Sequence, residues 1–233
     1  MSHRLASFKG PSTPTSSPVH QKQPASASSS PSKPTESTYH RKTRTLLQEL
    51  RSLTETWDDL VLMDGLKAAK SLVDTRTDLD NTLSITPNRL PRSHVVGQKL
   101  EAMEKRVAEL DAVIMKLERQ FRKICAVVEN LEALVIDAHK NKGASWVQKE
   151  PLWVTWSLEK FATSVSEILV PYHRSLDDHR SLVNTLRCHS VPFEESRNAI
   201  AAWAQQPWLE DLGWDTKWED ICAAEVDRWN ASR

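Results

Sequence analysis

The chain has 233 residues, enough for one domain of ordinary size or two small ones, and its 31 basic and 31 acidic residues leave no formal net charge. It holds five glycines but nine tryptophans, which favours helices over a β-rich or α/β enzyme that needs glycine for turns and phosphate loops. No apolar run approaches the roughly 20 residues that cross a bilayer, so no membrane span is expected. Three widely spaced cysteines favour free thiols in a reducing compartment over a disulfide framework.

Residues 1–42 are predicted to be a disordered, basic tail rich in serine and proline. Residues 1–45 hold seven basic residues against the single acid Glu36, and few apolar side chains are available to offset the entropy of ordering. The remaining 24 basic and 30 acidic residues give a mildly acidic body, which argues against a nucleic-acid clamp. The tail is expected to make only weak, salt-sensitive contacts with nucleic-acid phosphates.

A first helix is expected from about Thr43 to Leu83. Its apolar stripe repeats at three- and four-residue steps in Leu46, Leu50, Leu53, Trp57 and Leu60. The phase of this stripe slips near Gly65, which predicts a kink or a short break. Pro87 and Pro91 then end the helix, because proline has no amide donor and disfavours helix just before it.

A second, long helix is the clearest pattern in the sequence. Heptad a and d positions are apolar over five heptads in Leu100, Met103, Val107, Leu110, Ile114, Leu117, Phe121, Ile124, Val128, Leu131 and Val135. Val113, Val127 and Leu134 widen the apolar face at g positions, as is typical of a helical bundle. Residues 43–140 are therefore predicted to form an antiparallel helical hairpin or coiled coil. The alternative is self-association or pairing with another coiled-coil protein.

Residues 141–233 are predicted to be a tryptophan-rich helical part that packs on the hairpin. Gly143 stops the long helix, and a loop leads to a third helix at about 158–186. Pro171 lies inside that third helix and is expected to kink it. Two shorter helices are expected at about 194–205 and 215–230. The fold class expected for the whole chain is all-α.

The sequence predicts no catalytic residue, no metal site and no cofactor. No glycine-rich phosphate loop is present. His173 and His179 lie six residues apart, so a helix points them to different faces, unlike a pair of zinc ligands. Cys188 and His189 are neighbours at a helix end rather than a nucleophile and its base. We therefore expect a protein that is not an enzyme.

Two segments match the [ST]-P-x-[KR] pattern preferred by cyclin-dependent kinases. They begin at Ser30 and Thr86, and both fall where the sequence predicts irregular chain. Ser30 and Thr86 are the expected phosphorylation sites.

Most tryptophans lie in the second half of the chain, and two strings concentrate them, PLWVTW at 151–156 and WAQQPW at 203–208. Large flat side chains of this kind fill junctions between helices. Alternatively, exposed tryptophans mark a surface that binds a partner.

In kind, order and spacing these motifs resemble the cyclin-dependent kinase 2-interacting protein family. The resemblance rests on WDDLVL at 57–62 before Gly65, on PLWVTW followed by Phe161 and Tyr172, and on WAQQPW. It spans roughly residues 45–210.

The resemblance implies a nuclear, non-catalytic adaptor with protein partners and no small-molecule substrate. One implied role is DNA replication and checkpoint signalling, through cyclin-dependent or replication kinases and checkpoint factors. The other is an assembly with AAA+ ATPases that matures precursors of the large ribosomal subunit. The resemblance also implies five partner-binding residues: Trp153, Trp156, Trp203, Pro207 and Trp208. The alternative from the coiled-coil pattern is a structural subunit of a kinetochore or tethering complex.

Overall fold

The structure is a computed structural model that describes residues 36–85, 92–210 and 213–227. Within these ranges the regular structure is helical, and the only β-type pairing is an isolated bridge between Pro151 and Ser157. The described helices are, in chain order, α1 (Thr38–Asp58), η1 (Asp59–Gly65), α2 (Leu66–Ile85), α3 (Arg92–Lys142), α4 (Ala144–Lys149), α5 (Leu158–Ser166), α6 (Leu169–Arg187), α7 (Phe193–Gln205), α8 (Pro207–Glu210), α9 (Trp214–Glu219) and η2 (Asp220–Asp227). The all-α prediction is confirmed.

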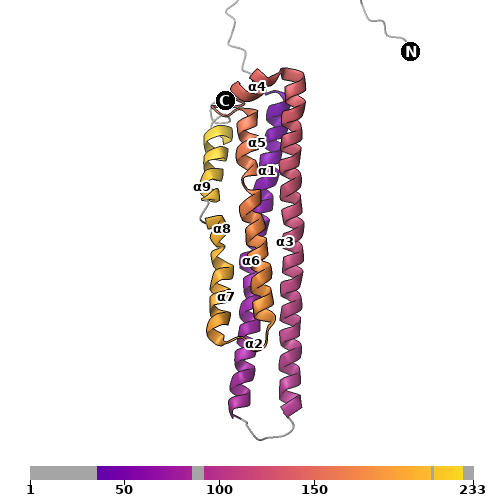
Figure 1. The fold of residues 1–233 in the computed structure, drawn as a ribbon, viewed down its shortest axis with the longest axis vertical. Helices are drawn as coiled ribbons and strands as arrows, with labels where there is room; N and C mark the ends of the chain where they lie inside the picture. Colours follow the sequence, from indigo (N-terminus) through magenta and orange to yellow (C-terminus); the bar gives the residue numbers. More distant parts are fainter. Residues whose placement is uncertain (1–35, 86–91, 211–212, 228–233) are drawn as a thin grey trace, which may run out of the picture. The chain divides into compact units, whose positions relative to one another are not determined.

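The helices form rods that run alternately in opposite directions (Figure 1). The first rod joins α1, η1 and α2 without leaving helical backbone, and α3 runs antiparallel beside it. The third rod, α5 and α6, packs on α3, and the fourth begins with α7, which packs on α2 and α6. The antiparallel pairing of the two long rods is as expected, while a regular supercoil along them stays a prediction.

The apolar face of α3 is as wide as the heptad pattern predicts. The three apolar g-position residues are buried, with 2–5% of their surface exposed: Val113, Val127 and Leu134. The reason is that α3 has two neighbours, the first rod on one side and α5 with α6 on the other. A face of a and d residues alone would cover only one of them.

The first helix begins at Thr38, inside the segment 1–42 that was expected to be disordered. Tyr39 explains the earlier start, because its ring packs on Trp146 with centroids 5.4 Å apart and its hydroxyl donates to Asp137 at 3.0 Å. These contacts with distant residues stabilise a turn that composition alone does not favour. Residues 1–35 lie outside the described ranges.

The phase slip near Gly65 is present, but its form differs from the expected kink or break. Residues Asp59–Gly65 are π-helical, so the chain stays helical while the wider turn shifts the apolar stripe. Leu50 and Trp57 are fully buried before the slip, and Ala69 and Leu72 continue the core after it.

The third rod breaks before the proline rather than at it. The break falls at residues 167–168, and Pro171 lies in the first turn of α6, where its missing amide costs no intrahelical bond.

Gly143 follows α3 with φ of 86°, as expected of a helix stop, but the short helix α4 replaces part of the expected loop.

The shorter helices fall close to their expected places. α7 matches the helix expected at 194–205. The helix expected at 215–230 is divided between α9 and η2, and its last residues lie outside the described ranges.

Trp203 of α7 is seated on the π-helical segment and locks the fourth rod to the first. Its ring is fully buried, and its Nε1 donates to the carbonyl oxygen of Val61 at 3.0 Å. A Cβ built on Gly65 would lie 2.9 Å from Cε2 of this ring and closer still to Cζ2. The glycine is therefore required because the indole fills the space of a side chain.

Gly65→Ala is expected to lower the free energy of unfolding by about 1–3 kcal/mol, because the methyl group collides with the Trp203 ring. Gly97→Ala is the matched control, since nothing lies within 4 Å of its added Cβ in α3. The control is expected to raise the free energy of unfolding by about 0.5–1 kcal/mol, the usual helix preference of alanine. Urea denaturation followed by circular dichroism measures both, and equal effects would contradict the lock.

Candidate functional site

The two tryptophan motifs lie at different places on the first rod. PLWVTW packs near the start of α1, where the Trp153 ring meets His40 edge-on with centroids 5.6 Å apart. WAQQPW packs near the end of α1 and on η1 through Trp57 and Val61. The structure does not bring the two motifs together into one site.

Burial divides the five tryptophan-motif residues that the resemblance singles out. Trp153 is 5% exposed and Trp203 is not exposed at all. The prediction that these two bind a partner directly does not fit their burial, because each fills a junction between helices. Trp156 and Trp208 are half-buried and Pro207 is exposed, so these three keep surface for a partner.

Gln206 completes the WAQQPW contact and was not anticipated. Its φ of 42° ends α7 in the left-handed region, and Pro207 opens the next helix. The amide Oε1 of Gln206 accepts from Trp57 Nε1 at 3.1 Å, and its Nε2 donates to Asp58 at 3.3 Å. A glutamine before proline at the end of a helix was the only sequence signal for this turn.

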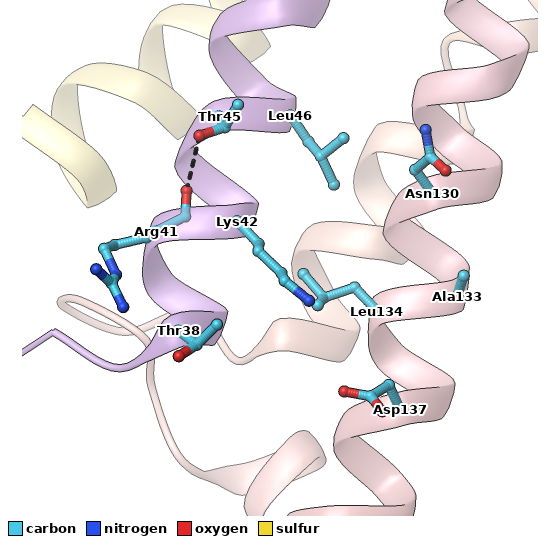
Figure 2. A pocket seen from close by; sticks show the side chains of 9 residues that line it. All are labelled: Thr38, Arg41, Lys42, Thr45, Leu46, Asn130, Ala133, Leu134 and Asp137. Atoms are coloured by element: carbon cyan, nitrogen blue, oxygen red, sulfur yellow. Dashed lines mark hydrogen bonds between the residues drawn. The ribbon is translucent and has the colours of Figure 1, made fainter.

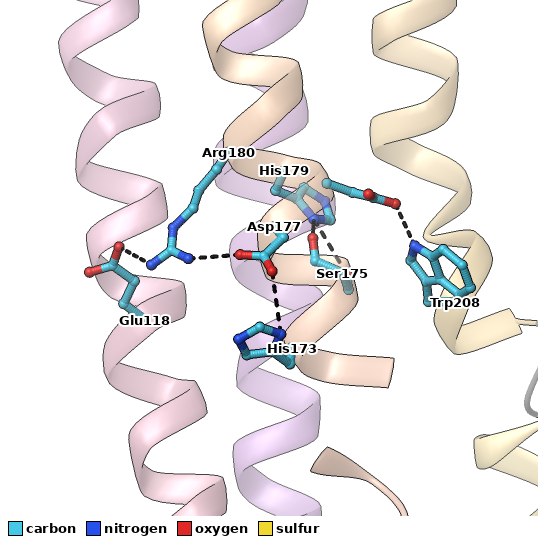
Figure 3. A network of polar contacts seen from close by, with 8 residues as sticks. Glu118, His173, Ser175, Asp177, His179, Arg180 and Trp208 are labelled. Carbon is cyan, nitrogen blue, oxygen red and sulfur yellow. Dashed lines mark hydrogen bonds and ion pairs between the residues drawn. The ribbon is translucent and has the colours of Figure 1, made fainter. Parts of the chain in front are cut away.

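His179 is buried behind Trp203, as part of the polar network in Figure 3. Its ring meets the Trp203 ring edge-on at 4.5 Å, and its Nδ1 lies 2.6 Å from the carbonyl oxygen of Ser175. Burial lowers the pKa of His179, while the carbonyls of Ser175 and Trp203 and the charge of Asp178 partly oppose this. His179 is therefore a neutral residue of the core.

His173 lies on the opposite, exposed side of α6 and pairs with Asp177 at 3.3 Å, so the expectation that the two histidines face apart is confirmed. Among the described residues no group of three or more His, Cys, Asp or Glu side chains is arranged to hold a metal ion.

Ion pairs on the surface tie α6 to its neighbours. Arg180 bonds Glu118 of α3 at 2.6 Å and Asp177 at 2.9 Å (Figure 3). The Trp208 indole donates to Asp178 at 2.6 Å, and the guanidinium of Arg174 lies 4.7 Å above the same ring. These exposed contacts orient the half-buried Trp208 but contribute little stability each.

The PLWVTW turn binds two carboxylates that come from opposite ends of the described chain. Trp153 Nε1 donates to Glu36 at 3.3 Å, and Arg44 pairs with the same carboxylate. On its other side, the backbone amides of Thr155 and Trp156 donate to Glu225 at 2.8 and 3.0 Å.

Glu225 is the most enclosed of these acids, with 5% of its surface exposed. The Thr155 hydroxyl donates a third hydrogen bond to Glu225, in addition to those from the two backbone amides. Burial by itself raises the pKa of Glu225, but the bonds from Thr155, Trp156 and Val154 outweigh it and the pKa is lowered. The turn is thus a receptor for an ionised carboxylate, a property that the sequence did not reveal.

A groove of about 640 Å³ opens between α1 and α3 (Figure 2). Leu46, Ala133 and Leu134 are its apolar lining residues, and Lys42 and Leu46 of α1 point across it toward α3. The residues that line it are Thr38, Arg41, Lys42, Thr45, Leu46, Asn130, Ala133, Leu134 and Asp137. Short side chains such as Ala133 and Thr45 leave the space open, and their alignment depends on the pairing of the two helices.

The expected phosphorylation sites, Ser30 and Thr86, lie outside the described residues. No disulfide joins Cys125, Cys188 and Cys222, all three of which lie in the described ranges. None of the helices in the described ranges combines the length and apolar character that a membrane crossing requires.

Comparison with known proteins finds no matching family model and no matching curated protein. The resemblance to the cyclin-dependent kinase 2-interacting protein family therefore rests on the motifs quoted above.

Acid is expected to destabilise the protein through His179. At about pH 6.5 and below, a histidine in the unfolded chain takes up a proton, whereas buried His179, with its lowered pKa, resists doing so. The free energy of unfolding should therefore fall as the pH drops from 7.5 to 5.5.

His179→Gln should flatten this pH dependence, while His189→Gln, at an exposed position, should leave it unchanged. Urea denaturation at a series of pH values measures the slopes. The same slope in His179→Gln as in the wild type would rule out this role.

Proposed function

We propose that the chain is a non-catalytic adaptor subunit of a nuclear complex, as its resemblance to the cyclin-dependent kinase 2-interacting protein family implies. In that role it joins an AAA+ ATPase assembly to precursors of the large ribosomal subunit. Kinases and checkpoint factors of DNA replication are the second set of partners.

The observation that most supports an adaptor is the groove between α1 and α3. Leu46 and Leu134 line it, and Lys42 of α1 points across it toward α3. A partner helix or extended segment can bury apolar side chains against the two leucines and direct an acidic side chain to Lys42. Asp137 on the α3 side favours one orientation of that segment.

The rival function, a structural coiled-coil subunit, requires an apolar seam on α3 that is free to pair with another chain. The central seam residues Leu110, Leu117 and Ile124 are fully buried against the helices of this same chain. That burial favours the adaptor over a zipper formed by α3.

Filling the groove tests the proposal. Ala133→Trp places a large side chain in the groove from an exposed position, so the packing of α3 is kept. Ala108→Trp, also exposed on α3 but outside the groove, is the matched control. Tagged wild type and both variants are purified from cells, with circular dichroism to check folding, and their partners are identified by mass spectrometry.

The expected result is recovery of AAA+ ATPase subunits with ribosome precursors, or of replication and checkpoint factors, by the wild type and by Ala108→Trp. Ala133→Trp should recover at least about tenfold less, the effect of losing roughly 1.4 kcal/mol of binding free energy. Equal recovery by Ala133→Trp, or recovery of kinetochore or tethering subunits instead, would refute the proposal.

A further inference from the structure

Residues 213–227 form a short helical segment, α9 with η2, and its Glu225 binds the PLWVTW turn. The buried side chains on this segment are Trp218, Ile221 and Glu225, each with 7% or less of its surface exposed. Steps of three and four residues place all three on one face. This is the anchor pattern by which an amphipathic helix binds a groove of another protein.

The polar anchor of this face is recognised mainly by backbone groups. Glu225 accepts from the amides of Thr155 and Trp156, and within the part of the chain that the structure describes its one side-chain donor is the Thr155 hydroxyl. Successive amides that converge on one carboxylate form an anion-binding concavity. The turn therefore selects a carboxylate, whatever chain supplies it.

The ion pair that joins this segment to Glu167 through Lys217 is half exposed and contributes little stability. A helix of fifteen residues is marginal on its own, so it needs packing on the rest of the chain, and Trp218, Ile221 and Glu225 are buried in that packing. The segment has five acidic residues and one basic residue, and repulsion among them favours release.

We propose that the PLWVTW turn is a docking site for an acidic amphipathic helix of a protein partner, and that residues 213–227 occupy this site until the partner displaces them. The partner helix carries a large aromatic residue, an aliphatic residue three positions later and a carboxylate four positions after that. This inference rests on the adaptor function. It adds the chemistry of one partner and the segment of the chain that competes with that partner for the site.

A second contact at the same turn agrees with this chemistry. Trp153 and Arg44 already hold the carboxylate of Glu36, and Lys160 lies 4.3 Å above the Trp156 ring. Indole and amide donors with two nearby cations favour an acidic segment over a neutral one.

Binding of a labelled peptide tests the proposal on the full chain. The probe is a fluorescein-labelled peptide with the sequence of residues 213–227, followed by fluorescence anisotropy. Glu225→Gln removes the charge that holds the chain's own segment, and Asp227→Asn, an exposed acid two residues away, is the matched control.

The peptide is expected to bind Glu225→Gln about tenfold more tightly than it binds the wild type or Asp227→Asn, because the covering segment no longer competes. A peptide with the same Glu225→Gln substitution should bind the Glu225→Gln protein about tenfold more weakly than the unchanged peptide does. Equal binding to all three proteins, or no loss with the altered peptide, would overturn the proposal.

Hydrogen exchange on the wild-type chain tests, without any substitution, whether residues 213–227 open locally and uncover the turn. Amides of residues 213–227 should exchange through a local opening far more readily than those of α3, and the amides of Thr155 and Trp156 should be exposed in the same opening. Protection equal to that of α3 would overturn the proposal.

Two further outcomes distinguish this proposal from a homodimer and from the adaptor function. If the wild type is a dimer that the peptide converts to monomers, a second copy of the chain occupies the site, and the proposal of a partner helix is wrong. If the peptide tests fail while Ala133→Trp still loses its partners, the adaptor function stands and only the role of the turn is refuted.

Discussion

The seat of Trp203 on the π-helical segment is the contact on which the rest of the bundle depends. The indole fits because Gly65 has no side chain. Its Nε1 donates to the carbonyl oxygen of Val61, which also accepts the π-helical hydrogen bond from the amide of Leu66. Because the same ring also covers His179, it joins the first, third and fourth rods at one point. A π-helical turn is costly in isolation, and it persists where the surrounding packing requires it.

The two proposed docking sites, the groove and the PLWVTW turn, both lie beside the first turns of α1. Lys42 and Leu46 border the groove against α3, whereas His40 and Arg44 contact Trp153 of the PLWVTW turn from another face of the same helix. Both surfaces combine apolar area with donors or cations, so both favour acidic amphipathic segments. A rigid bundle that presents two such places suits an adaptor that holds two partners together.

The parts that the sequence predicted are those governed by local periodicity. The wide face of α3, its stop at Gly143 and the phase slip at Gly65 all follow from spacing and backbone chemistry. What it could not predict depends on residues far apart in the chain. The early start of α1 requires Tyr39 to meet a ring that comes more than one hundred residues later, at Trp146. The carboxylate site of the turn likewise needs Glu225, and no local pattern pairs the two.

Replacing the indole of Trp203 by a ring without a donor tests the central contact most directly. Trp203→Phe keeps an aromatic side chain but removes the bond to the Val61 carbonyl and leaves space beside Gly65. The account predicts that urea denaturation shows a loss of about 2 kcal/mol or more in the free energy of unfolding. Trp208→Phe removes an exposed hydrogen bond from a half-buried ring and leaves an aromatic face under Arg174, so it should stay within about 0.5 kcal/mol of the wild type. A Trp203→Phe protein as stable as Trp208→Phe would contradict the account.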